Sequence, residues 1–281
     1  MVSVAATSAR AGEQPASTQR RQTSSHIAFT VSPFPIDGHS HWPVSCDAFP
    51  EHRQQIRDDC AYNRNNVKIV ALFTGLEAGP WGATHHAMED IALMRAIPGM
   101  TVLVPSDFPE VAEAVRASAS IEGPVYIRMA GFAADMSPIE ARREPFSPGK
   151  AATLREGTDL AIFATGTAVR TCLQVAELLA KDAISAGVLN VSTIKPIDRG
   201  AIETAAREVG LLLTVEEHSI VGGLGSAVAE VIAELGTGRL RRVGIPDRFC
   251  TEVAPYSELL AICGLDAAGV ESAARDLLRK A

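Results

Sequence analysis

Apolar runs and polar stretches alternate along most of the chain, beginning near residue 66. The first set of predicted strands lies at residues 67–73, 100–106 and 124–130. Helical spacing of apolar residues begins near residue 85 and again near residue 109, so a helix is expected between each pair of strands. Short apolar strands that alternate with helices are typical of a parallel sheet buried on both faces.

A second alternating set follows after residue 150. Its predicted strands are residues 159–165, 187–193, 211–217 and 241–246. Its predicted helices are residues 169–181, 199–209, 224–235, 257–263 and 267–280. Two such sets predict an α/β protein with two three-layer domains, each built on a mainly parallel sheet.

Two stretches do not follow this alternation. Residues 1–50 begin with a small, polar segment that has neither a helical nor a strand period, which predicts a disordered or atypical N-terminal segment. Three arginines and a single acid in the first 25 residues leave an organellar transit peptide as an alternative. Residues 131–149 are rich in proline and polar residues and are interpreted as a linker. The predicted domains are therefore residues 51–130 and residues 150–281.

Composition excludes several classes of protein. A net charge of −7 and a pI near 5.5 argue against a broad nucleic-acid surface, which needs clustered Lys and Arg. No apolar run approaches the roughly 18 residues of a membrane helix, so no membrane association is expected. Five cysteines without a C-x-x-C pair fit a reducing cytoplasm better than a disulfide framework or a zinc site.

The stretch at residues 79–100 carries the most chemical information. A Gly-rich loop brings His85 and His86 to the expected first turn of a helix, whose apolar face continues to Ile97. Free N–H groups and the helix dipole favour anionic ligands at such a place. The alternative is a tight turn in which both histidines are solvated or cap the helix.

The wording of this stretch resembles the pyrimidine-binding domain of the transketolase family of thiamine diphosphate enzymes. The matching residues are GPWGATHH at 79–86, followed by Glu89-Asp90, Arg95 and Ile97-Pro98. A second block, TIKPID at 193–198 with TVEEHSIVGGLGSAVAE at 214–230, resembles the C-terminal domain of that family. The resemblance runs from about Gln54 to the C-terminus.

This resemblance implies the transfer of a two-carbon ketol unit from a ketose phosphate to an aldose acceptor. It also implies thiamine diphosphate with Mg²⁺ as cofactor. The chain has no G-D-G…N segment to hold the metal and the diphosphate. In split transketolases that segment lies on a separate chain. The expected partner is therefore an N-terminal transketolase section, in a homodimer or heterotetramer that acts on sugar phosphates.

The resemblance also implies roles for individual residues. His85 is the expected catalytic and substrate-binding residue, which binds the oxygens of the donor, whereas His86 is expected to support the loop. Arg128 matches an arginine that binds substrate phosphate, although an ion pair at a strand end is an alternative. Trp81 stands where the family usually has an aspartate that binds a sugar hydroxyl, and Phe73 where many members have a histidine. These two aromatics predict a more apolar and narrower site.

The segment before Gln54 departs from the family. The glutamate that activates thiamine diphosphate and the aromatics that stack on its ring are not recognisable there, so no cofactor-binding residue is assigned. The alternatives are a 1-deoxyxylulose-phosphate-synthase-like subunit, a 2-oxo-acid dehydrogenase beta-like subunit, and a non-catalytic assembly subunit.

Three further patterns have other interpretations. Asp37, His39 and His41 match the first metal-binding strand of amidohydrolases, but the number of strand–helix units is too low for that barrel. The glycines at residues 222–225 do not complete a dinucleotide-binding motif. The residues at 216–218, Glu-Glu-His, are expected to form a polar strand-end cluster at a subunit interface rather than a catalytic group.

Overall fold

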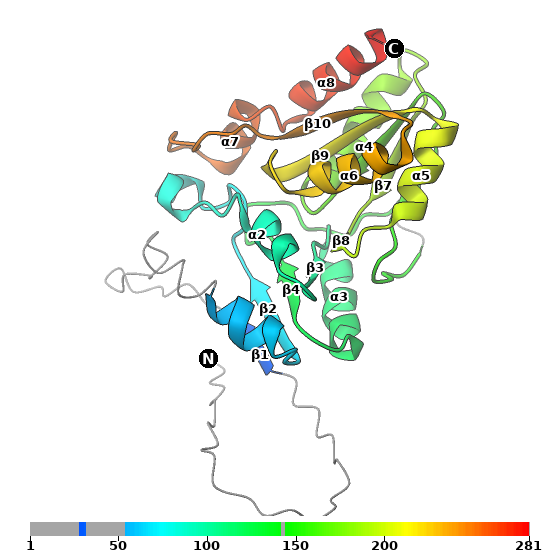
Figure 1. Ribbon diagram of the computed structural model, residues 1–281. Coiled ribbons are helices and arrows are strands. Elements are labelled where there is room, and N and C mark those ends of the chain that lie inside the picture. The colour runs from blue at the N-terminus through cyan, green and yellow to red at the C-terminus, as the bar shows by residue number, and fades with distance from the viewer. Residues whose placement is uncertain (1–27, 32–53, 142–143, 281) are drawn as a thin grey trace, which may run out of the picture.

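The first of two α/β domains is built on a five-stranded sheet. The computed structural model describes residues 28–31, 54–141 and 144–280. The strands of this sheet are, in spatial order, β1 (Ala28–Val31), β2 (Val67–Ala71), β4 (Val125–Arg128), β3 (Thr101–Leu103) and β8 (Thr193–Lys195). All pairs are parallel except β8 with β3. The π-helix η1 (Gln55–Tyr62) and α2 (Asp90–Ala96) cover one face, and α3 (Phe108–Ser120) covers the other (Figure 1).

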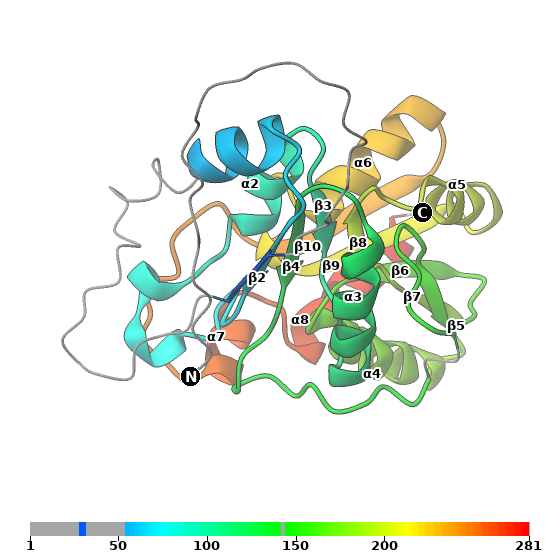
Figure 2. The same cartoon turned by 90° about the horizontal axis from the view of Figure 1, so that it is seen from below.

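The second domain contains another five-stranded sheet. Its strands are, in order, β10 (Arg239–Ile245), β9 (Leu211–Ser219), β6 (Leu160–Ala164), β7 (Ala186–Asn190) and β5 (Ala152–Arg155). Only β5 is antiparallel to its neighbour. The covering helices are α4 (Ala168–Ala180) with α8 (Ala267–Arg279), and α5 (Arg199–Glu208) with α6 (Leu224–Leu235) (Figure 2). The short helix α7 (Tyr256–Ile262) lies near the first domain's loops (Figure 2).

The α/β class with mainly parallel sheets is confirmed, but three strands were not predicted. Strand β1 falls inside residues 1–50, whose remaining residues lie outside the described part of the chain. Strands β5 and β8 are short antiparallel strands, and β8 leaves the second half of the chain to join the first sheet. The described residues of 131–149 form neither a helix nor a strand.

A shared apolar core fixes how the two domains sit against each other. Ile91 on α2 and Val102 on β3 are fully buried, and they belong to the same cluster as Phe163 on β6 and Leu224 on α6. The ammonium group of Lys195 adds a polar link across the same seam, because it donates to the carbonyl oxygens of the last turn of α2 at 2.6–2.8 Å. The loop before α2 is therefore held at the junction of both domains. Among the described helices, none is long and apolar enough to cross a bilayer.

Candidate active site

The loop that carries both histidines is closed at its base by backbone hydrogen bonds. The N–H of Gly75 donates to the carbonyl of Ala87 at 2.9 Å, and the N–H of Ala87 donates back at 3.1 Å. Between these residues the chain makes two 3₁₀ turns, η2 (Gly79–Trp81) and η3 (Ala83–His85). We call residues 75–87 the histidine loop.

The expectation that His85 and His86 lie in the first turn of a helix is wrong. His85 ends the turn η3, His86 has an extended backbone, and α2 begins only at Asp90. The bridge between Gly75 and Ala87 is the physical reason, because it pulls the chain after His86 into an extended pairing. Neither histidine therefore lies in the first turn of α2, where free backbone N–H groups would favour an anion.

Aromatic rings line one side of the histidine loop. Phe73 lies 5.4 Å from Phe132 and 6.4 Å from Trp81, and Trp81 lies 5.9 Å from His85, between ring centroids. These spacings are those of edge-on and tilted aromatic contacts. Trp81 and Phe132 remain 54% and 91% exposed, so both rings can meet another molecule. We call Phe73, Trp81 and Phe132 the aromatic wall; that it narrows a substrate site stays a prediction.

The two histidines have different surroundings. The exposed His85 contacts the hydroxyl of Thr84 through Nδ1 at 3.2 Å and presents its ring beside Trp81. His86 is half-buried, and neither ring nitrogen has a hydrogen-bond partner within the described part of the chain. Burial, together with the charge of His85, lowers the pKa of His86. His85 is therefore the imidazole that is open to a substrate, whereas His86 stays neutral inside the loop.

Arg128 lies at the end of β4 and is almost fully buried. Its Nε donates to the Asp90 carboxylate at 2.9 Å, and its Nη2 donates to the carbonyl oxygens of Glu217 and Ala87 at 2.9 and 3.4 Å. A cavity that it lines has a volume of about 10 Å³, which is room for one water molecule. This geometry matches the alternative of a strand-end ion pair, and phosphate binding by Arg128 stays a prediction.

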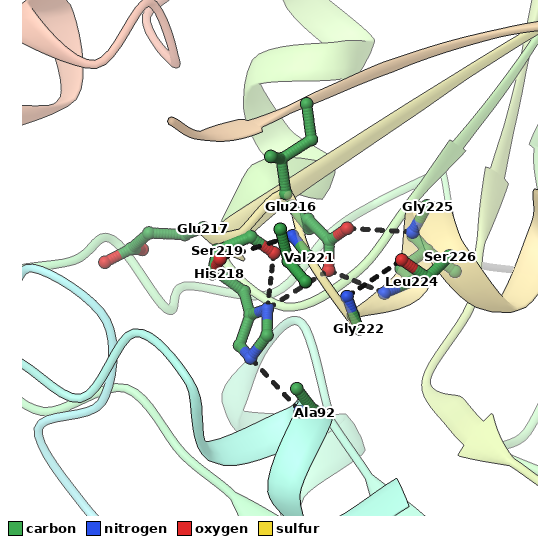
Figure 3. Close-up of polar contacts among 12 residues, drawn as sticks. Ala92, Glu216, Glu217, His218, Ser219, Val221, Gly222, Leu224, Gly225 and Ser226 are labelled. Atoms are coloured by element: carbon green, nitrogen blue, oxygen red, sulfur yellow. Dashed lines mark hydrogen bonds and ion pairs between the residues drawn. The ribbon is translucent and has the colours of Figure 1, made fainter. Parts of the chain in front are cut away.

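The end of β9 supplies a row of buried polar groups (Figure 3). Glu216 accepts from the N–H groups of Leu224 and Gly225, at the start of α6, at 2.6 and 2.8 Å. His218 donates from Nδ1 to the carbonyl of Ser219 at 2.7 Å, and its Nε2 accepts from the N–H of Ala92 at 3.2 Å. Burial lowers the pKa of His218, so the ring is neutral. These contacts tie backbone segments together, and they support a structural role for the cluster.

The described residues can be compared with the organic rings and with the metal of the implied cofactor, thiamine diphosphate with Mg²⁺. The aromatic wall and the unpartnered nitrogens of His86 suit flat organic rings. In the described ranges there is no group of three or more His, Cys, Asp or Glu side chains placed to hold a metal ion. The described ranges therefore offer aromatic rings to an organic ring system, but no such cluster of metal-binding side chains. The proposed amidohydrolase residues Asp37, His39 and His41 lie outside the described residues.

Several site residues were missed by the sequence analysis. Phe132 lies in the stretch interpreted as a linker. The Glu77 carboxylate holds the backbone on both sides of Phe132, because it accepts from the N–H groups of Gly131 and Ala134. Tyr256 reaches the site from α7, about 180 residues further along the chain than the histidine loop. Such long-range contacts leave no local pattern, and only the aromatic character of Phe132 and Tyr256 could have drawn attention to them.

Two family profiles match the chain. The pyrimidine binding domain of transketolase matches residues 51–130, and the C-terminal domain of transketolase matches residues 149–270. Together they span the histidine loop, Arg128 and the end of β9.

Individual proteins match over most of the chain. An apulose-4-phosphate transketolase subunit of Phocaeicola vulgatus is 40% identical over 227 residues, which are 81% of this chain and 72% of that protein. A 6-deoxy-6-sulfo-D-fructose transketolase subunit of Clostridium sp. strain MSTE9 is 41% identical, over 84% of this chain and 73% of that one. A solved structure described as a split gene transketolase, inactive beta4 tetramer, superimposes with a TM-score of 0.74 at 38% identity, and covers 83% of this chain and 73% of its own.

The environment of Glu216 predicts a pH dependence of stability. Burial raises the pKa of Glu216 to about 7 from an ordinary value of 4.5, although two backbone N–H groups act in the opposite direction. The folded protein thus binds a proton that the unfolded chain has lost between pH 4.5 and 7. This contribution to stability is full below pH 4.5 and is lost as the pH rises through 7. It amounts to on the order of 3 kcal/mol.

Glu216→Gln removes this titration and leaves the other groups in place. We expect the wild type to lose stability relative to this variant as the pH rises from 5 to 7, and the difference to level off above pH 7. The measurement is the thermal unfolding midpoint of both proteins from pH 5 to pH 8. A difference that stays constant over this range would show that Glu216 is ionised throughout.

Proposed function

The chain belongs to the transketolase family, and from this membership we propose that it is the C-terminal subunit of a split transketolase that is active only with an N-terminal partner chain. The reaction is the transfer of a two-carbon ketol unit from a ketose phosphate to an aldose acceptor. The observation that carries this proposal is the pairing of a pyrimidine-binding domain with a transketolase C-terminal domain, in a chain that aligns with separate subunits of two transketolases.

Thiamine diphosphate, on which the family depends, stabilises the two-carbon carbanion when it is bound. We place its diphosphate and Mg²⁺ on the partner chain, because the described residues offer no cluster of metal-binding side chains. The solved neighbour described as an inactive beta4 tetramer supports this division of labour, since it is an assembly of one kind of subunit and is inactive. We further propose that the working enzyme is a heterotetramer.

We assign His85 to the donor's oxygens. Its imidazole is exposed beside Trp81 and can donate a hydrogen bond to a carbonyl or hydroxyl oxygen. A donor of this kind lowers the barrier when it is aimed at an oxygen that gains negative charge in the transition state. Because the histidine loop is closed at Gly75 and Ala87, the backbone that carries the ring is constrained before the substrate arrives.

The aromatic wall bears on the choice of substrate. Trp81 and Phe73 offer apolar ring faces. At these two positions the family usually has an aspartate and often a histidine, which can form hydrogen bonds with a sugar hydroxyl. A donor that lacks this hydroxyl, or that presents an apolar C–H face there, fits the wall without leaving a polar group unpaired. We propose that the natural donor is such a sugar phosphate.

Reconstitution tests the proposed function. The chain is mixed with a chain that carries the diphosphate-binding domain of a split transketolase, and ketol transfer from a panel of ketose phosphates is measured together with thiamine diphosphate binding. We expect transfer and tight cofactor binding with the mixture, and neither with the single chains. Transfer by the isolated chain, or a stable complex that binds no cofactor and transfers nothing, would contradict the proposal.

His85→Ala removes the proposed hydrogen bond to the donor. In the reconstituted enzyme we expect kcat/KM to fall by roughly 100- to 1,000-fold, the effect of losing one transition-state donor. The unfolding midpoint should hardly change, because His85 is exposed. Thr84→Val is the matched control, since it replaces only the neighbouring hydroxyl by a methyl group and should change kcat/KM by a few-fold at most. Equal effects of both variants would remove His85 from the reaction.

Trp81→Asp tests the role of the aromatic wall. The variant should raise the kcat/KM for a hydroxylated donor, relative to its deoxy analogue, by roughly 10-fold or more, since a polar site discriminates against the analogue that leaves it unpaired. Tyr62→Asp is the control, because Tyr62 is a large aromatic on η1 and is 84% exposed. An unchanged ratio for Trp81→Asp would place Trp81 away from the substrate.

A further inference from the structure

Glu217 is a buried carboxylate whose two oxygens reach three separate segments. Oε1 accepts from the N–H of Leu76 at 2.7 Å, at the base of the histidine loop. Oε2 accepts from the hydroxyl of Thr167 at 2.6 Å and from the hydroxyl of Tyr256 at 2.5 Å. Thr167 precedes the first residue of α4, and Tyr256 is the first residue of α7. Figure 3 shows the Glu217 side chain pointing away from Glu216 and His218.

The backbone of Glu217 reaches the other end of the same loop. Its carbonyl accepts from Arg128 Nη2 at 2.9 Å, and that nitrogen also lies 3.4 Å from the carbonyl of Ala87. Two residues further along β9, the N–H of Ser219 donates to the carbonyl of Met88 at 2.7 Å. The C-terminal domain therefore contacts the chain at Leu76 and at Met88, next to the two ends of the histidine loop.

The start of the histidine loop is packed closely against Glu217 and the second domain. A side chain at Gly75 would collide with the Glu217 carboxylate, and Gly75 itself has a φ of +71° that favours glycine. Leu76 is fully buried in the apolar core of the second domain, together with Leu259 of α7. The start of the loop is thus anchored in the C-terminal domain by one apolar side chain and one carboxylate.

We propose that Glu217 is a positioning residue, which sets the place of His85 and Trp81 from the C-terminal domain by fixing the base of the histidine loop. The inference rests on the proposed function, because it takes these two side chains to meet the substrate. Without the carboxylate, the loop keeps its backbone bridge between Gly75 and Ala87 but loses its attachment to α4 and α7. The consequence is a less ordered His85, and therefore weaker stabilisation of the transition state.

Glu217→Gln is the informative variant, because Glu217→Ala would leave one buried and two partly buried donors without their acceptor and endanger folding. The glutamine keeps the size of the side chain and the acceptor for Leu76, whereas its NH₂ group faces two hydroxyls that donate to the carboxylate in the native protein. The matched control is Glu216→Gln, an equally buried carboxylate on the neighbouring residue. Its partners Leu224 and Gly225 lie within the C-terminal domain and not in the loop.

Hydrogen exchange of the full chain provides one readout, and kinetics of the reconstituted enzyme provide another. For Glu217→Gln we expect exchange of a peptide covering residues 75–88 to become about 10-fold faster, because the acceptor of the Leu76 N–H loses its charge and the attachment to α4 and α7 is weakened. We also expect kcat at saturating donor to fall by about 10-fold. For Glu216→Gln both quantities should stay within about two-fold of the wild type.

The other outcomes distinguish a failure of the positioning role of Glu217 from a failure of the proposed transketolase function. Unchanged exchange in Glu217→Gln, or equal losses in both variants, would overturn the positioning role of Glu217. Faster exchange with an unchanged kcat would overturn it too, while the transketolase activity of the wild type stands. If the wild-type mixture transfers no ketol unit, the proposed function fails. The exchange measurement then still decides whether Glu217 fixes the loop.

Discussion

The buried ion pair between Arg128 and Asp90 is the interaction on which the arrangement of the site depends. A guanidinium taken out of water must find acceptors for its N–H groups, and leaving one partner unpaired costs several kcal/mol. Arg128 meets this demand with Asp90 at the start of α2 and with backbone carbonyls of the histidine loop and of β9. Tyr126 supports the pair by donating to Asp90 at 2.7 Å. The first sheet, the loop and the second domain are thereby held at one point.

Most of the fold could be predicted from the sequence because buried parallel strands are continuous apolar runs. The strand β6, at Leu160–Ala164, is buried at every position, and such a run is readable without knowing its neighbours. Strands β5 and β8 could not be found in this way, because each has only three or four residues and pairs at an edge. The crossing of β8 into the first sheet depends on a partner about 90 residues earlier in the chain, and no local pattern encodes it.

The site was predictable to a smaller extent. The motif around His85 and the aromatic character of Trp81 and Phe73 were visible in the sequence, but the backbone of the loop was not. The apolar spacing that continues to Ile97 fits a helix starting at His85 as well as one starting at Asp90, and the bridge that decides between them is a tertiary contact. The hydrogen-bond partners of the Glu217 side chain lie between 39 and 141 residues away in the sequence. The sequence therefore showed that an acidic residue is present, but not which segments it connects.

The aromatic wall combines a strained backbone with firm support. Phe73 has a φ of +57°, a conformation that costs a bulky residue about 1–3 kcal/mol and persists only where its surroundings enforce it. The enforcement comes from residue 131, where only a glycine leaves room for the Phe73 ring, and from Glu77, which holds the backbone of residues 131–134. Because the backbone on both sides of the wall is held in this way, little backbone ordering is needed when a ligand meets this face. In the function proposed for this chain the wall meets the substrate, and the ring faces of Phe73 and Trp81 would offer no acceptor to a sugar hydroxyl placed against them.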